Sequence, residues 1–351
     1  MTQMASTGNR LATRFSGIQR GPAVAILAAL AALIALGLPM AGRLSPVIPN
    51  PQSPDIQYYR SVVAAVRGGE PYEASALALL RVRHAATTPF FTVRPPILAW
   101  LLARLPGDGE KLADLLLAGV ACAAVGAWLW RLSRLGRDAV FLVRAGLILF
   151  ASVAMTMRGH GLSYLHEAWA GLLIAASLAV RSDRRFAAAV ALGLVAALIR
   201  ELALPYLAVM AGMALLERRG REAGAFAIAL AIAGAVLAVH AYRVESLTAG
   251  DLAGASGWFA FGGWTFVLET TRWSYLAIPW LGAALLPLAI VGALGWKDAT
   301  GARLFALLAG FTLGFCIIGR PDNFYWGLMT APLIGVGLTL APEAIVDLAR
   351  R

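Results

Sequence analysis

The chain has 351 residues, of which 60% are hydrophobic and only 14% are charged, and its formal net charge is +11. A soluble domain carries about 25% charged residues, so this composition excludes an ordinary soluble protein and predicts one integral membrane domain over residues 1–351. The positive residues form short clusters between apolar runs, a pattern typical of membrane topology and not of a nucleic-acid-binding face. Cys122 and Cys316 lie inside apolar runs and show no disulfide or metal spacing.

The first apolar run, residues 23–40, follows a polar segment with three arginines. It is long enough to cross ~30 Å of hydrocarbon at 1.5 Å per residue. A cleaved signal peptide is the alternative interpretation, but its apolar core would cover only about 7–15 residues. We therefore expect a retained first helix with a cytoplasmic N-terminus, which places residues 41–108 on the outer side of the membrane.

The polar stretch 51–96 separates this helix from the other apolar runs and is expected to carry the chemistry. Ser53 is a typical N-cap, and Pro54 suits the first helical turn. Asp55 falls in that turn, where the helix dipole favours its ionised form. The glycines at 68–69 end this helix, and a second one follows directly. We expect two short amphipathic helices on the membrane surface.

The later apolar runs bring the total to roughly ten membrane-spanning helices. Arginine clusters agree with every turn and place both termini in the cytoplasm. Residues 95–105 are apolar but too short to span, so they are expected to form a third surface or re-entrant helix, and 241–272 an outer loop. The spans expected after the first are 111–132, 139–157, 162–180, a hairpin over 186–216, 223–240, 275–296, 304–318 and a last helix that ends at 350–351.

The run 186–216 has arginines at both ends and the pair Arg200-Glu201 in its middle. This pattern predicts two helical arms of ~14–16 residues, or about 21–24 Å each. Because the arms fall short of a ~30 Å hydrocarbon core, the apex should be recessed below the outer membrane face. A charged pair at that depth is costly unless it lines a wet cavity or finds a partner, which favours a functional role.

On this topology, the polar residues that are not topology signals converge on the outer face. A carboxylate there can act as a general base toward a hydroxyl, and arginines at the mouth of an apolar cavity can hold a phosphate. These parts suit a lipid phosphate donor and a hydroxyl acceptor. The residues are Asp55, Tyr58, Tyr59, Glu70, Glu73, Arg94, Arg158, His160, His166, Glu167, Arg200, Glu201, Arg243, Glu245, Arg320, Asp322 and Asn323.

Structural interpretations stand beside the functional ones. Asp55 can be a helix-start residue only, Arg94 a snorkelling interface arginine, and Arg200-Glu201 a mutual structural pair.

A metal site is not assigned. His166 and Glu167 are adjacent, so a helix points them about 100° apart. The spacing His160-x5-His166 is not a recognised ligand spacing.

The outer stretch carries a family resemblance. The residues DIQYYR at 55–60 and GGEPY at 68–72 resemble the first outer loop of GT-C-type membrane glycosyltransferases, which use polyprenyl-phosphate sugars. The pattern is closest to the polyprenyl-phosphate-mannose-dependent mannosyltransferases. The segment FTVRPPIL at 91–98 is similar to one found there and in the lipid A aminoarabinose transferases, where a lysine before the proline contacts the donor phosphate. Arg94 occupies that place here, and Arg200-Glu201 looks like the hairpin apex of such proteins.

The resemblance implies an all-α, GT-C-like polytopic fold in the bacterial inner membrane, with an active site at the outer face. A sugar would move from a polyprenyl-phosphate donor to a hydroxyl of a lipid, glycan or protein, with Mg²⁺, Mn²⁺ or no metal. Asp55 would be the catalytic base, and Arg94, Arg200 and Arg320 would bind the donor phosphate. Further substrate-binding residues would be Tyr58, Tyr59, His166, Glu167, Glu201, Asp322 and Asn323.

Two departures from the family leave the sugar and the acceptor open. Ile56 stands where many GT-C enzymes have a second acidic residue. The last outer loop carries Arg320, Asp322 and Asn323, where the mannosyltransferases tend to have histidine. One alternative function is a transporter or flippase for a lipid-linked sugar, which would not need Asp55 as a base. Another is a non-catalytic assembly subunit of a cell-envelope complex.

Overall fold

The computed structural model describes residues 13–45, 50, 52–157, 161–251, 260–274 and 278–351, and every element in these ranges is helical. The all-α prediction is therefore confirmed for the described part of the chain. The α-helices are α1 (Arg20–Ala41), α2 (Pro54–Arg67), α3 (Tyr72–Val82), α4 (Ile97–Ala103), α5 (Gly109–Ser133), α6 (Ala139–Val153), α7 (His166–Val180), α8 (Ala187–Ile199), α9 (Leu204–Leu216), α10 (Gly220–Thr248), α11 (Gly263–Thr271), α12 (Pro279–Gly295), α13 (Ala299–Ile317) and α14 (Ala331–Ala349).

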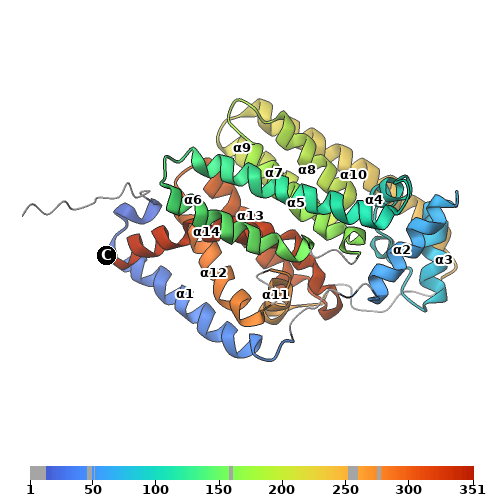
Figure 1. Ribbon diagram of the computed structural model, residues 1–351, viewed down its shortest axis with the longest axis horizontal. Helices are drawn as coiled ribbons and strands as arrows, with labels where there is room; N and C mark the ends of the chain where they lie inside the picture. The colour runs from blue at the N-terminus through green and yellow to red at the C-terminus, as the bar shows by residue number, and fades with distance from the viewer. Residues whose placement is uncertain (1–12, 46–49, 51, 158–160, 252–259, 275–277) are drawn as a thin grey trace, which may run out of the picture.

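The helices form an elongated bundle, with α2 and α3 together at one end (Figure 1). The start of α1 and the C-terminus lie at the other end (Figure 1). Within the described ranges, six 3-10 segments connect or extend the helices, and these are Arg14–Gly17, Phe90–Thr92, Ala154–Met157, Leu162–Tyr164, Glu201–Ala203 and Pro321–Met329.

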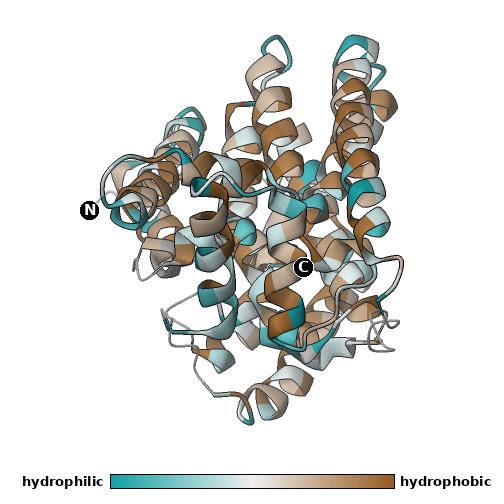
Figure 2. Cartoon of the chain, turned by 90° about the vertical axis from the view of Figure 1, so that its right-hand side faces the viewer, coloured by the Kyte–Doolittle hydropathy of each residue, from teal (hydrophilic) through white to brown (hydrophobic). Residues whose placement is uncertain are grey.

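Among the described residues, five helices are long and apolar enough to cross a membrane, namely α1, α5, α10, α13 and α14. Large apolar side chains such as Leu36, Leu115 and Ile228 are exposed on them. Such surfaces are unfavourable in water and suit a lipid environment. Hydrophobic colour runs along the helices, and hydrophilic colour gathers at several of their ends and connections (Figure 2). The chain is a helical, membrane-embedded protein.

The capping residue and the glycines predicted to bound the first helix of the polar stretch 51–96 act as predicted. The Ser53 hydroxyl accepts a hydrogen bond from the Ile56 amide at 3.4 Å, and α2 begins at Pro54. Gly68 is the C-cap of α2, and Gly69 follows with φ +91°, a left-handed conformation that glycine adopts at little cost. The predicted third short helix is present as α4, with only seven residues.

The predicted hairpin is also present. Its arms, α8 and α9, have 13 residues each, or about 20 Å, and the chain turns at Arg200 and Glu201. Helix α7 packs beside the hairpin, where the Ser177 hydroxyl donates to the Ala189 carbonyl at 2.6 Å and lies 2.5 Å from the Tyr206 hydroxyl. At the other end of α7, Arg200 Nε donates a hydrogen bond to Glu167 Oε1 at 2.6 Å, and this contact places the apex next to the N-terminal end of α7.

The expected loop 241–272 needs correction, because α10 continues to Thr248 and α11 forms from Gly263 to Thr271. No glycine or proline interrupts 241–248, so nothing stops the helix at its expected end. Val244 is buried against the rest of the bundle, and this packing supports the extra two turns.

Helices α12 and α14 meet backbone to backbone. A methyl group on Gly292 would overlap the carbonyl oxygen of Gly337, and one on Gly337 would overlap the carbonyl oxygen of Ala289. Small residues permit this close approach, as they commonly do between helices in membranes.

Candidate active site beside Asp55

Asp55 lies in the first turn of α2, and its side chain reaches solvent. Protein atoms also surround the carboxyl group, and this partial burial raises its pKa above the ordinary value. The nearby cations Arg94 and Arg83 oppose that rise, whereas the acidic groups Glu167 and Asp322 add to it. Three of these groups, Arg94, Glu167 and Asp322, belong to the predicted site. The structure therefore places Asp55 close enough to interact electrostatically with all three.

Arg94 points into the protein. One terminal nitrogen donates to the Phe91 carbonyl at 2.7 Å, and the other donates to the Tyr325 hydroxyl at 3.1 Å. The Arg94 carbonyl accepts a hydrogen bond from the Tyr72 hydroxyl at 2.8 Å, which ties this segment to α3. A snorkelling arginine keeps its head group in water, but the Arg94 side chain is buried.

Arg200 is bound by two carboxylates. Its Nε donates to Glu167 Oε1 at 2.6 Å, and a terminal nitrogen pairs with Glu201. The Arg200 and Glu167 side chains are each only 1% exposed. The mutual pair anticipated at the apex exists, and a third member, contributed by the first turn of α7, completes it. We call Arg200, Glu167 and Glu201 the apex triad.

The second oxygens of the triad carboxylates have unused hydrogen-bonding capacity. Glu167 Oε2 and Glu201 Oε2 are both buried, and neither has a hydrogen-bond partner among the described residues. Buried acceptors are normally satisfied, and an unmet one is costly. These two oxygens have lone pairs available to accept further hydrogen bonds.

The two tyrosines after Asp55 have different surroundings. The Tyr58 hydroxyl donates to the Ala76 carbonyl at 3.3 Å, so it joins α2 to α3. The Tyr59 ring lies 5.0 Å from the His166 ring, and both are buried. The charges that act on Tyr59 are those of Arg94, Glu167, Asp55 and Arg200. Tyr59 therefore lies among Asp55, Arg94, Glu167 and Arg200. We call these four residues, together with Tyr59, His166, Glu201 and Tyr325, the polar cluster, and Tyr58 is at its edge.

The segment before α14 closes the site from the other side. Arg320 lies 3.6 Å from Asp322, an ion pair whose carboxylate is largely exposed, while Asn323 is buried. Tyr325 in this segment receives the hydrogen bond from Arg94. Tyr325 was missed in the sequence reading, because it is one of three successive aromatic residues and such residues usually mark a membrane interface. Its contact with Arg94 links parts of the chain 231 positions apart.

Other polar residues of the expected outer face form a second group between α3 and α10. Glu73 Oε1 lies 3.6 Å from His240 Nδ1 and 3.8 Å from Arg243 Nη1, and the interaction with His240 lowers the pKa of Glu73. The other ring nitrogen of His240 lies 2.9 Å from the Val93 carbonyl, directly before Arg94. Through this contact with Val93, the group holds the segment that carries Arg94 against α10. Glu70 accepts from Ser75, and Glu245 is exposed, whereas Arg158 and His160 lie outside the described residues.

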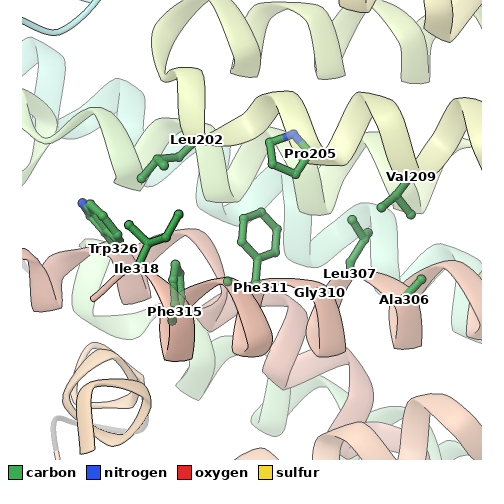
Figure 3. Close-up of a pocket in the computed structure, with 11 residues that line it drawn as sticks. Leu202, Pro205, Val209, Ala306, Leu307, Gly310, Phe311, Phe315, Ile318 and Trp326 are labelled. Carbon is green, nitrogen blue, oxygen red and sulfur yellow. The ribbon is translucent and has the colours of Figure 1, made fainter. Parts of the chain in front are cut away.

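An apolar groove of about 180 Å³ lies next to the polar cluster. Figure 3 shows side chains of α9 and α13 facing one another across it. Leu202 and Trp326 line one end, and each directly follows a residue of the cluster, Glu201 or Tyr325. The groove thus runs from the cluster along the bundle. Its lining residues are Leu202, Pro205, Val209, Ala306, Leu307, Gly310, Phe311, Gly314, Phe315, Ile318 and Trp326.

Glu167 and Glu201 both bind Arg200, and among the described residues no group of three or more His, Cys, Asp or Glu side chains could hold a metal ion.

No protein-family model, curated protein or solved structure matches the chain.

Proposed function

We propose that the chain is a GT-C-type membrane glycosyltransferase, which moves a sugar from a polyprenyl-phosphate donor to a hydroxyl of a lipid, glycan or protein. The observation that carries this proposal is the meeting of an accessible carboxylate, buried arginines and an apolar groove. Asp55, Arg94 and the apex triad are electrostatic neighbours, and the groove begins beside Glu201 and Tyr325. The segments that resemble the family, 55–60, 68–72 and 91–98, all belong to this end of the bundle.

Asp55 is the proposed general base. Its carboxylate takes the proton of the acceptor hydroxyl, whose oxygen then bonds to the anomeric carbon of the sugar. A carboxyl group with a raised pKa is a stronger base than an ordinary aspartate. As this bond forms, the bond from the anomeric carbon to the phosphate oxygen breaks, and the polyprenyl phosphate leaves with the electron pair.

The arginines stabilise the negative charge that grows on the departing phosphate. Arg94 is the first candidate, because its buried Nε has no hydrogen-bond partner among the described residues. Arg320 lies on the more exposed side of the site. Arg200 contributes its charge while it holds Glu167 and Glu201, whose free oxygens suit the hydroxyl groups of a sugar. Tyr59, His166 and Asn323 complete the proposed substrate contacts, with Tyr58 and Asp322 at the edge.

The groove between α9 and α13 is the proposed site of the polyprenyl chain. Its lining is almost entirely apolar, so it can take up hydrocarbon without leaving polar groups unsatisfied. The end at Leu202 and Trp326 adjoins Glu201 and Tyr325, which contact Arg200 and Arg94, so we place the phosphate of the donor at that end of the groove. A lipid-linked donor would then enter sideways from the membrane.

The proposed topology has roughly ten spans. It adds the shorter apolar helices α6, α7, α8, α9 and α12 to the five long ones. Both termini are then cytoplasmic, residues 41–108 lie outside, and the active site faces the extracytoplasmic side of a bacterial inner membrane. The arginine clusters between the spans support this orientation.

A deletion strain tests the proposal directly. We would complement it with the wild type, Asp55→Asn or Asp108→Asn, and compare lipids and glycans by mass spectrometry. Asp55→Asn should abolish the modification that the wild type restores, while binding of a polyprenyl phosphate by the purified variant survives. Asp108 is an exposed N-cap of α5, and asparagine also caps helices, so Asp108→Asn is the matched control.

Each outcome separates the candidate functions. Full restoration by Asp55→Asn would remove the catalytic role, and it would favour a flippase, which shares the groove and the arginines but needs no base. If the wild type bound no polyprenyl phosphate, both functions would be excluded in favour of an assembly subunit.

A further inference from the structure

A second site lies at the opposite end of α7 from His166 and Glu167. A pocket of about 780 Å³ is formed there by the end of α5, the connection between α7 and α8, and the start of α13. Helix α7 has 15 residues, so about 22 Å separates its two ends. We call this cavity the arginine pocket, after the five arginines in its lining, Arg131, Arg134, Arg181, Arg184 and Arg185.

The acidic residues of the pocket already have partners. Asp298 accepts hydrogen bonds from the amides of Thr300 at 2.7 Å and Gly301 at 3.0 Å, so it caps α13. Asp183 pairs with Arg181 at 3.1 Å and also with Arg219. Arg181 is also neutralised by Glu222, to which it donates hydrogen bonds of 2.7 and 3.0 Å. The uncompensated positive charge of the pocket therefore comes from its other four arginines.

Arg131 is held in place by neutral oxygen atoms. One terminal nitrogen donates to the carbonyls of Ala179 at 3.1 Å and Arg181 at 2.6 Å. The other donates to the Thr300 hydroxyl. Among the described residues, Arg131 makes no ion pair with a carboxylate. Its half-buried guanidinium is thus oriented by the fold, with its charge unmatched.

Three further arginines, Arg134, Arg184 and Arg185, line the pocket. The last two lie in a hydrogen-bonded turn between α7 and α8. Arg134 lies over the Trp130 ring at 4.0 Å. Arg184 and Arg185 are exposed, and no carboxylate in the described part of the chain pairs with either. Their turn is closed by a hydrogen bond from the Ser182 amide to the Arg185 carbonyl at 3.0 Å and by one from the Arg185 amide to the Ser182 hydroxyl at 3.0 Å.

Arginines that only set membrane topology need to lie on one side of the membrane, but they do not need to line a common concavity. Here two separate elements, the end of α5 and the connection between α7 and α8, bring arginines around one cavity, with Arg131 held inside and exposed arginine side chains at the rim. Arginine forks match phosphate oxygens in geometry as well as in charge. We propose that the arginine pocket binds the phosphate or diphosphate group of a ligand. This site is separate from the proposed transfer reaction.

Two sources offer this chemistry, namely the headgroup of an anionic phospholipid and a water-soluble phosphate compound. Full-length protein in phosphatidylcholine nanodiscs, titrated with pyrophosphate by calorimetry, tests the soluble source. Nanodiscs that mix phosphatidylcholine with phosphatidylglycerol, analysed by native mass spectrometry, test the lipid source.

The pocket variant is the double substitution Arg184→Gln and Arg185→Gln. Both side chains are exposed, so the fold should tolerate the change. The control is Arg350→Gln with Arg351→Gln, which removes the same charge from exposed positions outside the pocket. We expect the pocket variant to bind pyrophosphate or phosphatidylglycerol about tenfold more weakly, because charge-assisted hydrogen bonds are lost. The control should stay within about twofold of the wild type.

Binding of pyrophosphate that only the pocket variant weakens would support the proposal with a soluble ligand. Selective retention of phosphatidylglycerol with the same dependence would support it with a lipid. The proposal would be overturned if the wild type bound neither probe, or if the two variants lost binding equally, since the loss would then reflect net charge alone. None of these measurements depends on sugar transfer.

Discussion

The apex triad allows a quantitative prediction for Glu167→Gln. This substitution keeps the shape of the side chain and one acceptor oxygen, but removes the charge that Arg200 binds at 2.6 Å. It leaves Arg200 with Glu201 only, and it takes a negative charge from the first turn of α7, where the helix dipole favours one. The rest of the cluster, including Arg94, would then carry an excess of positive charge.

The loss of stability follows from the burial of the pair. Removing one partner of a buried ion pair costs about 3–5 kcal/mol. Because Glu201 still binds Arg200 and glutamine still accepts a hydrogen bond, we expect about 2–3 kcal/mol for Glu167→Gln. Unfolding entropy of ~2.1 cal/mol/K per residue over 351 residues amounts to about 0.7 kcal/mol/K. The melting temperature should therefore fall by about 3–4 °C.

Thermal unfolding in detergent, followed by intrinsic fluorescence, measures this shift. The control is Glu110→Gln, because Glu110 binds Arg60 through two hydrogen bonds of 2.8 Å, but the two side chains are 31% and 33% exposed. Such a pair contributes at most about 1 kcal/mol, so the control should shift the melting temperature by about 1 °C or less. Equal shifts for Glu167→Gln and Glu110→Gln would refute the view that the apex triad is a desolvated, structurally important ion pair.

Four other predictions concern the site, the topology and the core. Arg94→Ala should lower the transfer rate about 10²–10³-fold and Arg94→Lys less, and a wild-type rate for Arg94→Ala would leave Arg94 a packing role only. Because burial raises the Asp55 pKa above 3.8, its base form is lost at a higher pH than in an ordinary aspartate. The transfer rate should therefore fall as pH drops through that raised pKa, and a pH–rate profile flat down to about pH 4 would contradict this. Gln57→Cys in a cysteine-free background should react with impermeant reagents from the outer side only, and labelling solely from the cytoplasm would invert the proposed topology. Gly292→Ala should destabilise the protein by about 1–3 kcal/mol, and an unchanged unfolding midpoint would argue against backbone contact between α12 and α14.

The parts of the fold that local signals encode were predictable from the sequence. The Ser53 cap, the glycine stop after α2 and the hairpin turn at Arg200 each depend on neighbouring residues, and each is present in the structure. The true end of α10 was not predicted, because apolar length was taken as the guide and the helix continues through polar residues. Val244, which packs inward from that extension, shows that tertiary contact decides the end.

The candidate site was predictable as a set of residues, but not as a set of contacts. The pairing of Arg200 with Glu167 depends on how the hairpin packs against α7, and the contact of Arg94 with Tyr325 joins residues 231 positions apart. Contacts between residues so far apart in the chain produce no sequence pattern from which they could be predicted. The pairing of Arg200 with Glu201, by contrast, was open to prediction because the two residues are adjacent.

The backbone contact between α12 and α14 has a mechanical consequence for the whole bundle. Where two backbones touch at Gly292 and Gly337, any sliding or separation loses contacts along the full length of the seam, so this side behaves as a stiff frame. The seam between α9 and α13 is held by side chains around an unfilled volume, and side chains can change rotamer at small cost. Deformation of the bundle is thus concentrated at the α9–α13 seam, while the α12–α14 seam stays fixed.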